Sequence, residues 1–285
     1  LAVEVVTIDT TAKTGEVHIK FSGTLSSSTD TVIKIWYNGT DTMPATTDTY
    51  GRNAVWGGFS DVWHFQSAGT DSTSTGKTLS AINAPTHSAG KLSGNGFDNG
   101  TSTDKGYRKT ADLMGFTSAT QSFRQSIWFN LNTHPTGTGV AWIMNRMYGE
   151  SAGTQTRFTY NNNSGSPKLV FQNDGGGSNA EYTVTLTIDT WYNIIYQNEA
   201  GTSRIYFEGA LVASGTISGS VGYSGYPDEI SFLTDRTSYA GGCTPAHGDE
   251  GRLIVGSYST ANWITTEYNN QSSASTFYST SAEAG

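Results

Sequence analysis

Paired acidic residues are the first candidates for chemistry in this sequence. Two carboxyl groups at alternating positions on one face of a strand can act as nucleophile and general acid–base in cleaving a glycosidic bond. The chain has the acidic pairs Asp228–Glu229 and Asp249–Glu250, and in each pair the two residues are adjacent. Adjacent strand residues point to opposite faces, so neither pair matches that arrangement. We therefore interpret these residues as solvated acids in turns.

The histidines offer a second kind of chemistry, but their spacing does not favour a metal site. They are His18, His64, His87, His134 and His247. No two of them have the i,i+2 or i,i+4 spacing of a metal-binding pair, so zinc is not expected. His64 lies between two aromatic residues, and we interpret it as a strand residue in or beside the core. Cys243, the single cysteine, could be a reactive thiol, but we interpret it as a small buried or half-buried side chain.

The stretch Thr190–Gly215 predicts the kind of element that would position functional side chains. Tyr192–Gln197 and Arg204–Phe207 are rich in β-branched and aromatic residues, and Gly201 lies between them. These features predict a β-hairpin. Glu208–Gly209 then predicts a second tight turn, although Glu accepts a positive φ less readily than the Asn or Asp usual at such a position.

Alternation of apolar and polar residues predicts further strands at Glu16–Phe21, residues 33–37 and Ser122–Leu131. The clearest period of two has four residues expected to face inward: Tyr182, Val184, Leu186 and Ile188. One short helix is predicted near Thr260–Tyr268, with Ser259 or Thr260 as its cap and Asn269–Asn270 as its end.

The composition agrees with these local patterns. Only 14% of residues are charged and there are 34 glycines, which is typical of many short strands joined by turns. We predict an all-β fold, a two-sheet antiparallel jelly-roll sandwich. The net charge is −8 with no basic stripe, so nucleic acid is not an expected partner. No apolar run approaches the roughly 20 residues of a membrane span, so membrane insertion is not expected.

Several motifs together resemble a known family. They are the Thr190–Gly215 hairpins, Trp-Tyr-Asn-Gly at 36–39, Val-Trp-His-Phe at 62–65 and the closing segment from Leu253 to the predicted helix. The set resembles concanavalin A-like, laminin G-like jelly rolls that follow a small domain of unknown function in bacterial and phage surface proteins. This resemblance implies an N-terminal β-strand appendage at residues 1–52, interpreted as truncated, and a jelly roll at residues 53–285.

The resemblance also implies a calcium site. Members of this family often hold one Ca²⁺ between the loop after the first jelly-roll strand and the stretch before the last strand. Those segments match here at Asp71 and Asp249, which we expect as metal ligands. Carboxylates in Gly-rich loops are suitable ligands for this ion. Lys77 stands where an oxygen ligand would be expected, and its ammonium group could neutralise the same carboxylates instead.

Aromatic side chains in two loops are the candidates for ligand binding. Tyr and Trp faces stack on sugars, and polar side chains bond to sugar hydroxyls. The loops carry the candidate residues Tyr223, Tyr226, Asp228 and Tyr239. A jelly roll would present both loops at its rim, although crowded aromatic residues also serve as core.

We therefore expect a non-catalytic, lectin-like surface module that binds glycans or mediates attachment, located outside the cell or on a cell or virion surface. One alternative is a structural component of a virion or cell-surface layer, in contact with other copies or other structural proteins. A second alternative is a polysaccharide hydrolase or lyase, although the Arg, Gln-x-His and Tyr-rich strand typical of lyases of this fold are missing. Fold alone does not separate these functions.

Overall fold

The computed structural model describes residues 1–23, 28–29, 31–34, 40, 42–92, 94–100, 105–109, 121–136, 140–148, 155–162, 165–173, 177–217, 228–234 and 244–279. Within these ranges, only the backbone of residues 146–148, 155–156, 173, 177–179 and 228–229 is described.

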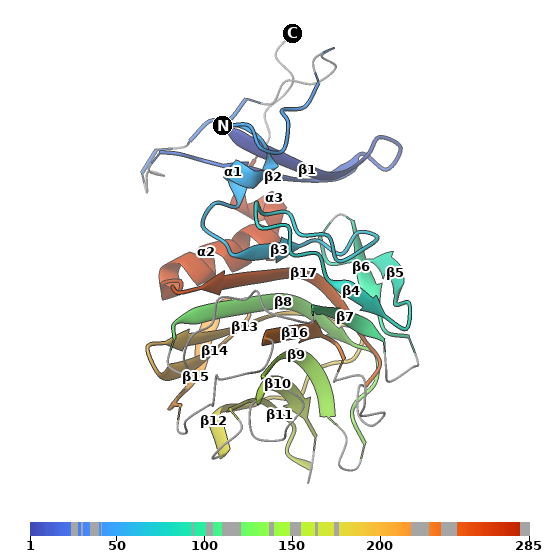
Figure 1. The fold of residues 1–285 in the computed structure, drawn as a ribbon, viewed down its shortest axis with the longest axis vertical. Coiled ribbons are helices and arrows are strands. Elements are labelled where there is room, and N and C mark those ends of the chain that lie inside the picture. The colour runs from blue at the N-terminus through green and yellow to red at the C-terminus, as the bar shows by residue number, and fades with distance from the viewer. Residues whose placement is uncertain are drawn as a thin grey trace.

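Two antiparallel sheets form a sandwich, which confirms the predicted all-β class (Figure 1). The seven-stranded sheet has the order β12 (Gly177–Thr183), β11 (Lys168–Asn173), β10 (Gln155–Asn161), β9 (Val140–Tyr148), β16 (Asp228–Phe232), β7 (Gly106–Lys109) and β4 (Ser80–Ile82). The eight-stranded sheet has the order β15 (Ala210–Thr216), β14 (Thr202–Phe207), β13 (Trp191–Glu199), β8 (Phe123–Leu131), β17 (Ala246–Val255), β6 (Asn95–Asp98) and β5 (Thr86–Ala89), and β3 (Asp61–Trp63) also pairs with β17.

The core lies between the two sheets and is rich in aromatic residues. Tyr196 of β13 stacks on Phe171 of β11 with ring centroids 3.6 Å apart, which joins one sheet to the other. Every residue of β8 is buried, because its second face is also covered. There, Ile264 of the helix α2 (Ala261–Ser272) packs with Ile195 and Tyr206 on the outer face of the eight-stranded sheet. The central strands of this sheet are therefore buried on both faces.

The predicted hairpin is confirmed. Glu199 pairs with Thr202, so the turn consists of Ala200 and Gly201, and both have positive φ. This geometry is typical of the two-residue turns that match strand twist. Glu208 also has a positive φ of 53°. It is held there by its side chain, which accepts hydrogen bonds from the backbone N–H of Asn193 and from the hydroxyl of Tyr268.

The helix α2 begins as predicted, with the Thr260 hydroxyl accepting a hydrogen bond from the backbone N–H of Trp263. Its predicted end is wrong, because Asn269–Asn270 lie within the helix, which continues to Ser272. Two four-residue helices, α1 (Arg52–Val55) and α3 (Ala274–Phe277), were not predicted. In the part of the chain that the structure describes, no helix is long and apolar enough to cross a membrane.

Two strand predictions need correction. The strand expected through Ile188 stops at Thr183, and Ile188 is exposed although Leu186 is buried. The alternation of apolar and polar residues by itself therefore predicted a longer strand than the one that forms. Of the strand predicted at residues 33–37, residues 33 and 34 lie outside any strand, and residues 35–37 fall outside the described ranges.

An N-terminal hairpin, β1 (Ala2–Asp9) and β2 (Thr14–Lys20), forms its own two-stranded sheet. It lies above β3 and β17, at the end of the molecule opposite β10 and β11 (Figure 1). The backbone N–H of Val3 donates to the carbonyl of Tyr50, close to the start of α1. The division into an appendage at 1–52 and a jelly roll at 53–285 stays a prediction.

Candidate functional site: a carboxylate–histidine cluster under the hairpin

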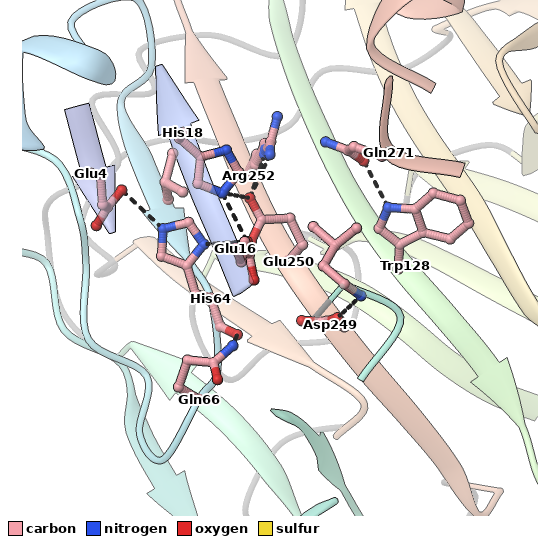
Figure 2. A network of polar contacts seen from close by, with 12 residues as sticks. Glu4, Glu16, His18, His64, Gln66, Trp128, Asp249, Glu250, Arg252 and Gln271 are labelled. Carbon is pink, nitrogen blue, oxygen red and sulfur yellow. Dashed lines mark hydrogen bonds and ion pairs between the residues drawn. The ribbon is translucent and has the colours of Figure 1, made fainter. Parts of the chain in front are cut away.

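Four side chains meet between the N-terminal hairpin and the eight-stranded sheet. We call them the carboxylate–histidine cluster: Glu16 and His18 of β2, His64 directly after β3, and Glu250 of β17. One nitrogen or oxygen atom from each lies within 4.8 Å of the others. Figure 2 shows the four side chains converging from three separate elements.

The local structure of β2 and β17 explains how the cluster forms. Glu16 and His18 are two positions apart in β2, so they share a face of the hairpin. That polar face is the buried one, whereas Val17 on the other face is exposed. In β17 the register shifts between Asp249 and Arg252, and Glu250 has a φ of 54°. Such a bulge changes the direction of a side chain.

The distances within the cluster are short. His18 Nε2 lies 2.8 Å from Glu16 Oε1, and His64 Nδ1 lies 2.5 Å from Glu250 Oε2. His64 Nδ1 is also 3.7 Å from Glu16 Oε1, and His18 Nε2 is 4.0 Å from Glu250 Oε1. The two imidazole rings are stacked with centroids 5.1 Å apart. Each histidine therefore faces carboxylates from both the hairpin and the sandwich.

A second layer of contacts holds the cluster in place. His64 Nε2 lies 3.1 Å from Glu4 Oε2, and the indole N–H of Trp56 donates to the same oxygen. On the other side, Arg252 donates to Glu250 Oε1 through Nε at 2.8 Å. Arg252 also donates to Glu267 of α2, at 2.6 Å. These contacts link the hairpin, the sandwich and the helix through buried charged groups.

Burial and neighbouring charges shift the pKa values of these groups in opposite directions. Burial alone would lower the pKa of His64, but the charge of Glu250 and hydrogen bonds to Glu250 and Glu4 raise it to about 10. Burial would raise the pKa of Glu250, but the charges of His64 and Arg252 hold it below its usual range. Without a bound cation, His64 would therefore carry a proton at neutral pH.

A groove of about 380 Å³ leads to one side of the cluster. Its lining combines β1, the segment after β3 and α1, with Glu4, His64, Gln66 and Arg52 among the residues that contribute. Figure 2 shows Gln66 next to His64, whose backbone carbonyl accepts a hydrogen bond from the Gln66 side chain. Of the four cluster residues, His64 lines this groove, together with Glu4.

The two predicted calcium ligands lie in different hydrogen-bonded environments. The Asp71 carboxylate accepts hydrogen bonds from three backbone N–H groups and two hydroxyls, provided by Val62, Thr73, Thr75 and Lys77. The Asp249 carboxylate accepts hydrogen bonds from the backbone N–H groups of Lys91 and Leu92. Burial and the charge of Glu250 raise the pKa of Asp249 well above its usual range. A calcium site at these carboxylates stays a prediction.

The interpretation of Asp249–Glu250 as solvated turn acids is wrong, because each is only 2% exposed. The ammonium group of Lys77 lies 3.5 Å from Asp61 Oδ2, so one carboxylate that it reaches is Asp61. His64 is buried beside the core, as expected, but its charged partners were not predicted. The one local signal for them was the Glu16-x-His18 spacing within a strand.

Three of the four predicted ligand-binding residues lie outside the described part of the chain. Tyr223, Tyr226 and Tyr239 lie outside the described residues, as does Cys243. Asp228 is the first residue of β16, but its side chain is outside the description. Glycan contact at these positions therefore stays a prediction.

No family model matches the chain, and no curated protein matches it. Solved structures do match. Domain 4 of AbnA, a GH43 extracellular arabinanase from Geobacillus stearothermophilus in complex with arabinotriose, is 15% identical with a TM-score of 0.54, covering 73% of this chain and 96% of that domain.

Two other structures each match 75% of this chain at 13% identity. A Trypanosoma rangeli sialidase matches with a TM-score of 0.56 over 33% of its own length, and the binding domain of botulinum neurotoxin serotype G with 0.55 over 51%. At such identities the likeness is one of fold. The chain therefore has a β-sandwich fold found in domains of carbohydrate-processing enzymes and in toxin binding domains.

Proposed function

We propose that this chain is a non-catalytic, lectin-like module that binds glycans or mediates attachment at a cell or virion surface. The observation that carries the proposal is the match to arabinanase domain 4, because it covers 96% of that domain, which was solved with arabinotriose. Structures of Trypanosoma rangeli sialidase with sialic acid and of botulinum neurotoxin binding domains match as well. The proposal does not depend on the identity of the sugar.

The rim loops predicted from the sequence are the proposed contact surface. Tyr223, Tyr226 and Tyr239 would stack on sugar rings, and Asp228 would bond to hydroxyl groups. Sugar faces are apolar and sugar edges are polar, so this mixture of side chains suits both. The proposed surface is distinct in sequence from the carboxylate–histidine cluster.

Binding to a glycan array tests this function. The array includes arabinan oligosaccharides and sialylated glycans, and the full chain is labelled and applied in buffers with Ca²⁺ and with EDTA. We expect saturable binding to at least one glycan class. Tyr226→Ala and Tyr239→Ala should weaken that binding by roughly 5- to 150-fold, taking the about 1–3 kcal/mol of a base stacked on an aromatic side chain as the guide for a stacked sugar. Tyr50→Ala is the matched control, because Tyr50 is 59% exposed and lies outside the proposed surface.

The other outcomes distinguish the alternative functions. Absence of glycan binding together with self-association or binding to a structural partner would favour a virion or surface-layer component. Release of reducing sugars or unsaturated products from a polysaccharide panel would contradict the non-catalytic proposal.

A further inference from the structure

We propose that the carboxylate–histidine cluster binds one divalent transition-metal ion of the zinc class, and that the ion fastens the N-terminal hairpin to the sandwich. Glu16 and His18 would bind it from the hairpin, and His64 and Glu250 from the sandwich. This inference is independent of glycan binding, because it concerns how two parts of the chain are joined.

The positions of the donor atoms suit such an ion. Zinc lies about 2.0–2.2 Å from imidazole nitrogens and carboxylate oxygens, which places tetrahedral ligand atoms about 3.3–3.6 Å from one another. His64 Nδ1 lies 2.5 Å from Glu250 Oε2 and 3.7 Å from Glu16 Oε1, and one donor atom from each of the four side chains lies within 4.8 Å of the others. The observed separations therefore bracket the tetrahedral value, and small side-chain shifts would complete the site.

The outer contacts are those expected around a metal-binding histidine. Such a histidine usually gives its second ring nitrogen to a carboxylate, which fixes its orientation and tautomer. His64 directs Nδ1 into the cluster and Nε2 toward Glu4, and the Trp56 indole holds Glu4 in turn. Arg252 occupies one oxygen of Glu250, which leaves Oε2 directed at His64. Figure 2 shows Glu4 next to His64 and Arg252 next to Glu250.

The charge of the buried network gives an independent reason for a divalent cation. The network contains four carboxylates and two guanidinium groups: Glu4, Glu16, Glu250, Glu267, Arg124 and Arg252. With neutral histidines, two negative charges remain in a region where desolvation makes them costly. One divalent ion compensates both charges, whereas protons would have to occupy both histidines to do the same.

The donor types distinguish this site from the predicted calcium site. Two imidazole nitrogens and two carboxylate oxygens favour a borderline ion such as Zn²⁺. Calcium takes six to eight oxygen ligands and does not favour imidazole. The groove that reaches His64 and Glu4 provides an entry path. The cluster would therefore prefer zinc to calcium.

Titration of the chelator-treated full chain with Zn²⁺ tests the site. We expect calorimetry to show one ion bound per chain, and Zn²⁺ to raise the melting temperature by several degrees. When Co²⁺ replaces Zn²⁺, we expect the visible absorption spectrum typical of a Co²⁺ ion with few ligands. His18→Gln and Glu16→Gln each remove one ligand and should weaken Zn²⁺ binding at least tenfold. Glu4→Gln should weaken it about 10- to 100-fold through His64 alone.

His87→Gln is the matched control, because His87 is a histidine outside the cluster that bonds to Tyr107. It should retain the parent affinity for Zn²⁺. Circular dichroism establishes that each variant is folded. Two ligand variants are used so that the test still stands if one of them fails to fold. Absence of saturable Zn²⁺ binding by the parent would overturn the proposal, as would equal affinities of the parent, His18→Gln and Glu16→Gln. Glycan binding is measured separately, so failure of one proposal leaves the other intact.

Discussion

At the scale of single residues, buried carboxylates are the main polar feature of this protein. Asp71 organises the loop after β3, Asp249 holds the segment at Lys91–Leu92, and Glu250 lies in the carboxylate–histidine cluster. Buried carboxylates are expensive to leave without partners, so each has a defined set of donors. Their environments lead to two predictions, one for calcium and one for pH.

The calcium prediction concerns Asp71 and Asp249. If an ion binds both, millimolar Ca²⁺ should raise the melting temperature of the parent by several degrees above its value in EDTA. Asp249→Ala loses two hydrogen bonds in either buffer, so the informative quantity is the change on adding Ca²⁺, which should vanish in the variant. Thermal unfolding monitored by circular dichroism measures it. Equal melting temperatures of the parent in both buffers would exclude a stabilising calcium site.

Asp61 should make the stability of the protein pH-dependent. Burial raises its pKa to about 7, against the opposing influence of Lys77 and Thr75. Because the folded pKa lies above the ordinary value of 3.8, this contribution is fully present below pH 3.8 and is lost as the pH rises through about 7. Asp61→Asn removes the titrating group, so its stability relative to the parent should rise by about 1–3 kcal/mol between about pH 5 and pH 8.

Urea unfolding of both proteins at several pH values measures this difference. Other groups titrate in both proteins, so the difference between them isolates Asp61. A constant difference across the range would contradict the raised pKa.

At the scale of elements, α2 covers the second face of the eight-stranded sheet and is tied to it by polar contacts. Glu267 binds Arg124 of β8 and Arg252 of β17, and the Trp128 indole donates to Gln271. Figure 1 shows the helix lying along β17. The first turn of the helix depends on Thr260 as its cap.

Thr260→Ala should lower the free energy of unfolding by about 1 kcal/mol, because a backbone N–H in the first turn loses its acceptor. Thr260→Ser should retain most of the stability, since it keeps the hydroxyl group. Thr266→Ala, in the middle of the same helix, is the control, and it should be neutral or stabilising because Ala is the better helix former. Chemical denaturation measures all three. A loss in Thr266→Ala as large as that in Thr260→Ala would contradict the capping role.

At the scale of the whole molecule, the carboxylate–histidine cluster and Trp56 are among the described contacts that join the N-terminal hairpin to the sandwich. Trp56 is 4% exposed, and its ring contacts His18 of the hairpin and Arg252 of the sandwich. It follows directly after α1. The interface therefore depends on compensation between the buried charges of the cluster and on the Trp56 indole, which excludes water from those charges.

Trp56→Ala should cost about 3–5 kcal/mol and expose the hairpin to proteases before the sandwich unfolds. Trp56→Phe keeps a ring but loses the N–H donated to Glu4, so its effect should be intermediate. Limited proteolysis followed by mass spectrometry locates the first cleavage. Initial cleavage within the sandwich, rather than the hairpin, would show that Trp56 does not control this interface.

The amino-acid sequence by itself determined the all-β class, the β13–β14 hairpin and the start of α2. These features depend on neighbouring residues: alternation along a strand, Gly201 in a two-residue turn, and Thr260 before a helix. Local signals predicted the ends of elements less reliably. The helix α2 continues past Asn269–Asn270, and the strand predicted through Ile188 ends at Thr183. Each end depends on packing against other elements.

Only the tertiary structure decided the carboxylate–histidine cluster. His64 and Glu250 are 186 positions apart, and no local spacing relates them. The bulge in β17 and the placement of the hairpin's polar face against the sandwich bring them together with Glu16 and His18. Desolvation and charge compensation depend on distances in space rather than on spacing along the chain. Asp249 and Glu250, which the sequence pattern assigns to solvent, are therefore buried in the folded protein.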